Sequence, residues 1–256
     1  MLNQILGWLR HGMNTCTSAL LTAQLLKRAE PVLSVSQVPV VVVAPHEDDE
    51  TFGCGGLIAL KRQLGVPVTV VFVSDGGGGY QEGTTAPPDI VAVREKEALE
   101  ATGVLGVPVE HVQFLHYPDT RLGKLDEVDR RRLVSTLTEC FNQHAQLEVY
   151  VTHQRDLHPD HEATCRAVME AVSRSSSQVR LFEYPIWIRW MGKFHRNLQW
   201  SDFPGLIKVS IAPVHATKLR AIQAYTSQIG MLGRAHLRCY EQVWEIFVER
   251  PRPHQP

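Results

Sequence analysis

The heptapeptide Val-Pro-Val-Val-Val-Val-Ala at residues 38–44 decides the fold class. Apart from the proline near its start, it is a β-branched run, which is typical of a strand buried on both faces of a parallel sheet. A second such run, with proline at the same early position, covers residues 66–74, and the pattern of residues 57–64 between them is helical. Two buried strands joined by a helix form a βαβ unit, so this part of the chain predicts an α/β fold.

The alternation of strands and helices continues to about residue 178. We expect further elements in the order helix, strand, helix, strand, helix at residues 91–105, 112–116, 125–144, 148–152 and 161–173. The prediction is therefore a Rossmann-like α/β domain, with a mostly parallel sheet and helices on both of its faces. Beyond residue 178 the pattern loosens, and we expect two strands and one helix, at residues 179–184, 243–248 and 216–227.

The sequence pattern divides the chain into three parts. Residues 37–249 form the predicted α/β domain, residues 1–36 a helical extension before it, and residues 250–256 a disordered tail. The extension has apolar residues at helical spacing, so we expect amphipathic helices that pack on the domain or on a partner subunit of a homo-oligomer. It lacks the basic start and the small cleavage-site residues of a secretory signal.

The bulk composition excludes several classes of function. Lysine and arginine total 26 against 27 acidic residues, and this balance gives no reason to expect nucleic acid or an anionic membrane as partner. No apolar stretch approaches the ~20 residues that a membrane span needs. The five cysteines are widely spaced and form no CxxC pair, so we expect a reduced, cytoplasmic protein without a disulfide framework.

Chemistry-bearing residues follow the first strand directly, in Pro-His-Glu-Asp-Asp-Glu at residues 45–50. Ligands of open α/β sheets bind at the carboxyl ends of strands, where this motif falls. Consecutive acids buried beside a histidine would repel one another, and a divalent metal would remove that repulsion. His46 and Asp49 are three residues apart, so one turn can bring both to a single ion. The alternative is a solvated acidic loop that starts a helix.

A second motif, Asp-Leu-His-Pro-Asp-His at residues 156–161, follows the strand expected at residues 148–152. One of its histidines can complete the three protein ligands that a catalytic zinc site has beside its water. We assign this role to His161, because it lies at the start of a helix. His158 is then the electrophilic or acidic histidine, which a carboxylate would hold as an imidazolium facing the developing oxyanion or the leaving amine.

The two motifs together resemble those of the LmbE-like or PIG-L family of zinc-dependent N-deacetylases. That family's motifs usually read Ala-His-Pro-Asp-Asp-Glu and His-Pro-Asp-His, which correspond here to residues 45–50 and 158–161. Weaker similarities at other positions extend the resemblance over most of residues 38–230. Glu47 departs from the pattern, since the family normally has proline there. It frees the loop backbone and adds a carboxylate, which either points to solvent or adjusts the charge of the site or the substrate entrance.

The resemblance implies roles for single residues. Zinc, or another divalent transition metal, would be bound by His46, Asp49 and His161. Asp48 would be the general base that deprotonates a water on the ion. His158 would stabilise the oxyanion, and either Asp48 or His158 would protonate the departing amine. Asp160 would orient His158 and raise its basicity.

Substrate contacts follow less directly from the resemblance. Family members bind a sugar through an arginine near the start of the second crossover helix, so Arg94 is a candidate contact. The alternative interpretation is that Arg94 only forms an ion pair with Glu97, three residues later on the same helix. Asp119 is a second candidate for a sugar contact. The alternative interpretation is that it is a structural residue of a turn. We expect the glycine-rich loop from Gly76 to Pro88 to lie at the rim of the site, where it could act as a lid.

The resulting prediction is a zinc-dependent hydrolase that removes the acetyl group from a small N-acetylated amino sugar or sugar conjugate. Two alternatives stay open. One keeps the chemistry and changes the substrate to a non-sugar or thiol-conjugate amide. The other is a non-catalytic module that binds a sugar or nucleotide and retains the metal site as a structural element.

Overall fold

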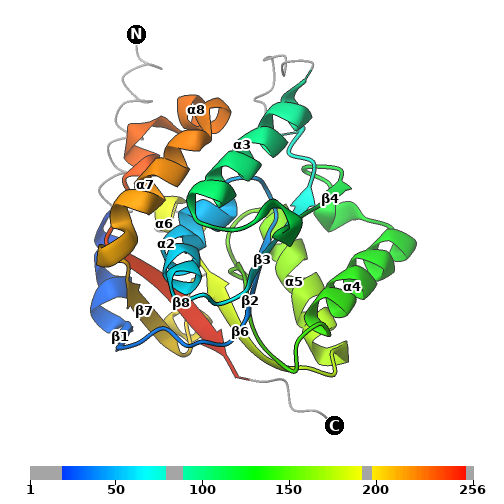
Figure 1. Cartoon of the computed structure of the whole chain (residues 1–256), viewed down its shortest axis with the longest axis horizontal. Coiled ribbons are helices and arrows are strands. Elements are labelled where there is room, and N and C mark those ends of the chain that lie inside the picture. The colour runs from blue at the N-terminus through cyan, green and yellow to red at the C-terminus, as the bar shows by residue number, and fades with distance from the viewer. Residues whose placement is uncertain (1–18, 79–88, 192–197, 252–256) are drawn as a thin grey trace.

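One mixed sheet of eight strands organises the computed structural model, which describes residues 19–78, 89–191 and 198–251 (Figure 1). The strands are β1 (Glu30–Val32), β2 (Val40–Ala44), β3 (Val68–Ser74), β4 (Val112–Tyr117), β5 (Gln146–Thr152), β6 (Gln178–Tyr184), β7 (Leu206–Ser210) and β8 (Trp244–Arg250). Their order across the sheet is β1-β7-β8-β6-β5-β2-β3-β4. Strand β8 runs antiparallel to β6 and β7, whereas the other neighbours are parallel.

Helices cover both faces of this sheet. They are α2 (Asp49–Gln63), α3 (Ile90–Val104), α4 (Glu127–Phe141), α5 (Pro159–Arg174), α6 (Trp187–Met191), α7 (His215–Ala224) and α8 (Thr226–Leu237). Alternate residues of β2 face two separate cores: Val40 and Val42 pack under α2, α3 and α7, whereas Val41 and Val43 pack under α4 and α5. Figure 1 shows the same division of helices between the two sides. The predicted α/β class, mostly parallel with helices on both faces, is confirmed.

Helix α2 begins at Asp49, well before the expected start at residue 57, so the first motif itself starts the helix. The Gly-Cys-Gly-Gly segment at residues 53–56 hides this helix in the sequence, because glycine is a poor helix former. Packing explains the glycines. A Cβ at Gly53 would collide with the ring of Tyr184, and a Cβ at Gly56 with the side chain of Ile211.

The N-terminal extension joins the sheet where the structure describes it. Residues 19–28 are helical, Leu25 and Ala29 are buried, and β1 pairs with β7 as an edge strand. Neither β1 nor β7 is expected from the sequence pattern, and the expected helix at residues 216–227 is two helices, α7 and α8. The boundary between an extension and a domain at residue 37 stays a prediction.

The C-terminal strand extends further than expected. Arg250, the first residue of the predicted tail, ends β8 and contacts Glu183 of β6 at 2.7 Å, and the remainder of the tail stays a prediction. Residues 252–256, residues 1–18 and most of the expected lid loop lie outside the described residues. None of the described helices is long and apolar enough to cross a membrane.

Strand β2 lies where the chain changes direction across the sheet. From β2 the chain passes to β3 and β4 on one side, and it then returns to β5 on the other side. In open α/β sheets this switch point is where ligands bind, beyond the carboxyl ends of the strands. The two motifs follow β2 and β5, which pair with each other, so the fold brings both motifs to the switch point.

Candidate metal centre and active site

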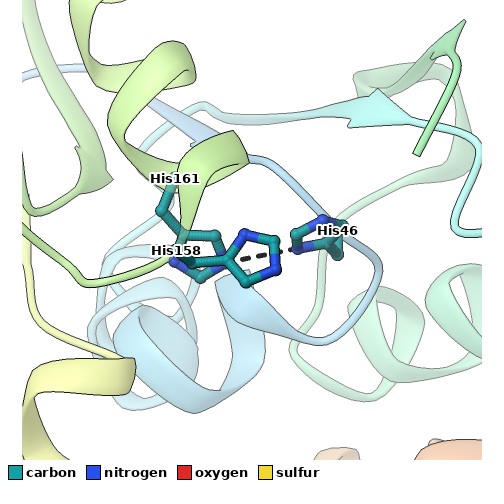
Figure 2. A group of neighbouring side chains, drawn as sticks. All are labelled: His46, His158 and His161. Carbon is teal, nitrogen blue, oxygen red and sulfur yellow. Dashed lines mark hydrogen bonds between the residues drawn. The ribbon is translucent and has the colours of Figure 1, made fainter. Parts of the chain in front are cut away.

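Three donor atoms from the two motifs meet at the carboxyl ends of β2 and β5. They belong to His46 in the loop after β2, to Asp49 at the start of α2 and to His161 in the first turn of α5. Nδ1 of His46, Oδ2 of Asp49 and Nε2 of His161 are 3.2 Å apart in all three pairs, and Figure 2 shows the contact between the two imidazoles. Ligands placed tetrahedrally at ~2.0–2.1 Å from zinc are about 3.3 Å apart, so these atoms fit one face of its coordination sphere.

The charges around these three ligand candidates also favour a cation. Burial alone would lower the pKa of His161, but the carboxylates of Asp49 and Asp156 raise it to about 9. Burial also opposes the charged form of Asp49, yet the imidazoles of His161 and His46 hold its pKa well below its usual range. The pKa of His46 is raised, against burial, by Asp119 and two further carboxylates. A divalent cation would satisfy the same carboxylates that now favour protonated histidines.

The second ring nitrogen of His46 faces two buried carboxylates. Its Nε2 lies 3.0 Å from Oδ1 of Asp119 and 3.5 Å from Oδ2 of Asp160. These three residues could form a metal group of their own. The 3.0 Å distance to Asp119 is that of an imidazole N–H and its acceptor, however, with the Asp160 carboxylate close by but farther away, and such an acceptor orients a metal-binding histidine. We therefore place the proton on Nε2, which leaves Nδ1 for the ion.

This placement corrects the expectation for Asp160 and adds a contact for Asp119. The motif predicts that Asp160 orients His158, but the Asp160 carboxylate contacts His46 and accepts the backbone N–H of Leu122 at 3.0 Å. Only the backbone N–H of Asp160 meets His158. Asp119, expected as a sugar contact, is buried and also accepts the N–H group of Gly78 at 3.0 Å. The Asp160 carboxylate therefore faces His46 and not His158, whereas the role of Asp119 as a sugar contact stays a prediction.

Asp156 is the corresponding partner of His161, and the sequence pattern assigns it no role. Its Oδ2 lies 2.7 Å from Nδ1 of His161, which leaves Nε2 for the ion. The same carboxylate accepts three backbone N–H groups at the start of α6, those of Ile186, Trp187 and Ile188. The sequence does hold a signal for this role. Asp156 is an acidic residue that follows the end of a strand and precedes a ligand candidate by five residues.

His158 lies beside the three ligand candidates. Its ring centroid is 5.0 Å from that of His46 and 4.8 Å from that of His161, and Figure 2 shows the three rings together. Its ring also stacks on that of Trp187. The three histidines together could also hold an ion. Nδ1 of His158 accepts the backbone N–H of Asp160 at 3.3 Å, however, so the proton of a neutral ring lies on Nε2. We therefore place His158 outside the metal's ligands, as a donor beside them.

The protonation state of His158 differs from the expected one. Burial, followed by the positive charge of His161 and His46, lowers the pKa of His158 to about 4. The imidazolium that the motif predicts is therefore a minor form near neutral pH. A neutral imidazole can still donate its N–H to a developing oxyanion.

Asp48 begins α2 as its N-cap residue, directly before the candidate ligand Asp49. Its backbone angles, φ 150° and ψ −26°, are ones that residues other than glycine rarely adopt. Among the described residues, its carboxylate accepts no hydrogen bond. Burial and the charge of Asp49 raise its pKa well above the usual range. A raised pKa makes this carboxylate a better proton acceptor than an ordinary aspartate, which suits a general base.

Glu47 is fully buried and faces Arg94 instead of solvent. Its Oε2 lies 3.3 Å from Nε of Arg94, and burial raises the pKa of Glu47 to about 7 although the guanidinium opposes this. Arg94 is 3% exposed, and it donates to the carbonyls of Gly76 and Glu47, both at 3.1 Å. The alternative in which Arg94 pairs with Glu97 is not met, and its role as a sugar contact stays a prediction. The side chain is committed to protein groups, and Glu97 instead binds Thr226 and Ser227.

Known proteins match this chain in both sequence and structure. The profile of the PIG-L family, described as GlcNAc-PI de-N-acetylase, matches residues 41–172, which include both motifs. A probable N-acetyl-alpha-D-glucosaminyl L-malate deacetylase 2 from Bacillus anthracis is 30% identical over 207 residues, which is 79% of this chain and 86% of the relative. Diacetylchitobiose deacetylase from Thermococcus kodakarensis is 26% identical over 236 residues, 90% and 80% of the two chains. A conserved protein from Thermus thermophilus superposes with a TM-score of 0.63 at 25% identity, over 84% of this chain and 96% of the other.

Proposed function

Because the chain belongs to the PIG-L family, we propose that it is a zinc-dependent hydrolase that removes the acetyl group from an N-acetylated amino sugar or sugar conjugate. The observation that carries this proposal is the set of three donor atoms, each 3.2 Å from the other two, beside the free carboxylate of Asp48. Metal-assisted amide hydrolysis needs this combination of an ion site and an adjacent base.

The ion would be held by His46, Asp49 and His161. When bound, zinc would supply Lewis acidity toward the amide oxygen and lower the pKa of a water toward ~7. Two buried acids, Asp119 and Asp160, would keep the His46 tautomer that ligation needs, and Asp156 would do the same for His161. Imidazole and carboxylate also suit other divalent transition metals, so the metal content must be measured.

Asp48 and His158 would divide the proton transfers and the charge stabilisation. Asp48 would take a proton from the attacking water and later return it to the departing nitrogen. His158 would donate the N–H of its Nε2 to the carbonyl oxygen as negative charge develops there. The pKa of His158, lowered to about 4, supports this division, because a neutral imidazole is a poor acid toward the amine.

The relatives' names support the substrate class. The Bacillus anthracis relative is named for an N-acetylglucosaminyl malate, and the Thermococcus kodakarensis relative for diacetylchitobiose, which are both N-acetyl sugars. We extend this class to the present chain as a proposal. A cytoplasmic location is part of it, since Cys54, Cys140, Cys165 and Cys239 are all free, as in a reducing compartment. The oligomeric state stays a prediction.

The deciding experiment combines metal analysis with an acetate-release assay. The purified protein should contain about one zinc per chain, and it should release acetate from at least one of a panel of N-acetyl sugars and their conjugates. Acetate release only from N-acetyl compounds without a sugar would favour the non-sugar amidase. Bound zinc with no hydrolysis of any compound in the panel would favour the non-catalytic module and contradict the proposal.

A further inference from the structure

The imidazole of His158 has a hydrogen bond at one atom and a stacking contact on its ring. Its Nδ1 accepts the backbone N–H of Asp160 at 3.3 Å, which fixes one atom of the ring and leaves the ring plane to other contacts. Trp187 of α6 supplies such a contact. Its indole stacks on the imidazole with an angle of 23° between the planes and the centroids 5.7 Å apart. The direction of Nε2, the proposed oxyanion donor, therefore depends on where this indole lies.

The backbone of Trp187 is held at both ends of one peptide group. The N–H of Trp187 donates to Oδ2 of Asp156 at 3.1 Å. The carbonyl oxygen of Ile186, which belongs to the same peptide group, accepts the hydroxyl of Tyr240 at 3.0 Å. Tyr240 is itself buried, and its ring stacks on that of Phe52 in α2 with the centroids 4.9 Å apart. The peptide group that precedes the indole therefore cannot turn without breaking two hydrogen bonds.

His236 of α8 contacts the indole side chain itself. The rings of Trp187 and His236 meet edge to face, at 72° and with the centroids 5.8 Å apart. Burial lowers the pKa of His236 to about 4, so its ring is neutral near pH 7. The one hydroxyl proton of Tyr240 goes to the Ile186 carbonyl, so Nε2 of His236 donates to the Tyr240 oxygen at 3.0 Å. Trp187 is thus fixed by its backbone and by its ring.

We propose that Trp187, held by His236 and Tyr240, is a positioning residue that fixes the ring plane of His158 and so directs Nε2 toward the substrate's carbonyl oxygen. This inference rests on the proposed function. The alternative role is a sugar contact, since Trp187 is only partly buried. A residue that acts through His158 affects the chemical step, so its loss should lower kcat and leave KM nearly unchanged.

The first test is Trp187→Leu, which keeps an apolar side chain and removes the planar ring. Removing an oxyanion donor costs about 10²–10³ in kcat, so a misdirected donor should cost about 10–100-fold, with KM within about twofold of its original value. Trp187→Phe keeps an aromatic ring and should recover most of the lost kcat. Trp244→Leu is the matched control, because Trp244 is also partly buried but packs on Lys208 of β7, next to the edge strand β1. Its kinetics should not change.

A double-mutant cycle tests whether Trp187 acts through His158. In a protein that already carries His158→Ala, the further change Trp187→Leu should lower kcat by less than about twofold, because the ring that Trp187 orients is gone. A second fall of about 10–100-fold in that background would show that Trp187 acts on another group, and it would overturn the inference.

The order of the His158 ring supplies a readout that does not depend on activity. NMR relaxation of the imidazole C–H groups, assigned by the signals that disappear in His158→Ala, gives an order parameter for this ring. The order parameter should fall in Trp187→Leu and keep its original value in Trp244→Leu. If the original protein hydrolyses no N-acetyl compound, the proposed function fails, and the order parameter still decides the positioning role. An unchanged value in Trp187→Leu would contradict that role.

Two kinetic results would also contradict the inference. A KM raised tenfold or more at constant kcat would make Trp187 a substrate contact, and kinetics equal to those of the Trp244→Leu control would leave it no part in the reaction. If Trp187→Leu does not fold, Trp187→Met fills more of the space with a side chain that has no planar ring. The same fall in kcat at constant KM is expected for that variant, and any other kinetic pattern contradicts the proposal.

Discussion

Both candidate histidine ligands use each of their two ring nitrogens. His46 directs Nδ1 and His161 directs Nε2 to the proposed ion, and in each case a buried carboxylate faces the other nitrogen. The acids that orient the two rings therefore matter as much for the ligand set as the ligands themselves. The partner of His161, Asp156, lies in the same motif, whereas Asp119, which faces His46, comes from the segment after β4.

Asp48→Asn separates the base from the metal ligands. The amide cannot take a proton from water, so we expect kcat to fall by about 10²–10⁴ while zinc stays bound. Acetate release measures the first effect and metal analysis of the purified variant the second. An active Asp48→Asn enzyme would show that another residue is the base, and loss of zinc would show that Asp48 is itself a ligand.

Metal affinity should rise with pH up to about 9. With the pKa of His161 at about 9, this imidazole is protonated at neutral pH, and an ion must displace that proton in order to bind. Each displaced proton makes the affinity change about tenfold per pH unit below the pKa of the group that loses it. Zinc titrations against a chelator between pH 6 and 10 would measure this slope. A flat profile from pH 6 to 8 would contradict the assignment of His161 as a ligand.

At the scale of the elements, the short helix α6 is tied to the metal site by one side chain. Asp156 accepts the backbone N–H groups of Ile186, Trp187 and Ile188 and also faces His161. Trp187, at the start of α6, stacks on His158 with the centroids 5.7 Å apart. One carboxylate therefore sets the position of both histidines of the second motif, one directly and the other through α6.

Asp156→Asn should weaken metal binding about 10–100-fold, because the amide lacks the negative charge that favours the His161 tautomer. One oxygen remains for the N–H groups of α6, so the fold should persist. The control is Asp126→Asn, since Asp126 caps α4 through the N–H groups of Val128 and Asp129 at 2.9 Å but lies outside the site. Zinc titration of the two variants is the measurement. Equal affinity in both would remove Asp156 from the metal site.

At the scale of the whole molecule, the sheet continues beyond the parallel strands through β8, which lies between β6 and β7. Glu245 of β8 is buried and accepts the backbone N–H groups of Gly56 and Leu57 in α2, at 2.7 and 2.8 Å. Lys218 of α7 completes this contact, binding Glu245 at 2.6 Å and the carbonyl of Phe52 at 2.9 Å. The last third of the chain thus fixes the helix that begins at the metal site.

Lys218→Met should lower the free energy of unfolding by about 3–5 kcal/mol, because it leaves the buried charge of Glu245 without its partner. Urea denaturation would measure the loss. Lys218→Met/Glu245→Gln removes both charges and should recover part of it. The exposed pair of Arg132 and Asp129, 3.3 Å apart, supplies the control, since Arg132→Met should have a far smaller effect. A similar loss in the two single variants would show that the burial of the Lys218 pair is unimportant.

The sequence by itself determined the α/β class and the place of the site. Buried parallel strands read as continuous β-branched runs, and the motifs follow two of them directly, so both predictions need only local order along the chain. It also singled out the three ligand candidates that the fold brings to within 3.2 Å of one another, and their role as ligands stays a proposal.

The tertiary structure alone decided which distant groups the buried polar side chains contact. Arg94 bonds across 47 residues to the Glu47 carbonyl, and Lys218 binds the carbonyl of Phe52 across 166 residues. Strand β8 likewise takes its antiparallel place between strands that the sequence pattern does not order. Such contacts depend on which segments the fold packs together, and a buried charge or donor takes the partner that it finds there. For this reason Arg94 pairs with Glu47 instead of Glu97, and the Asp160 carboxylate faces His46 instead of His158.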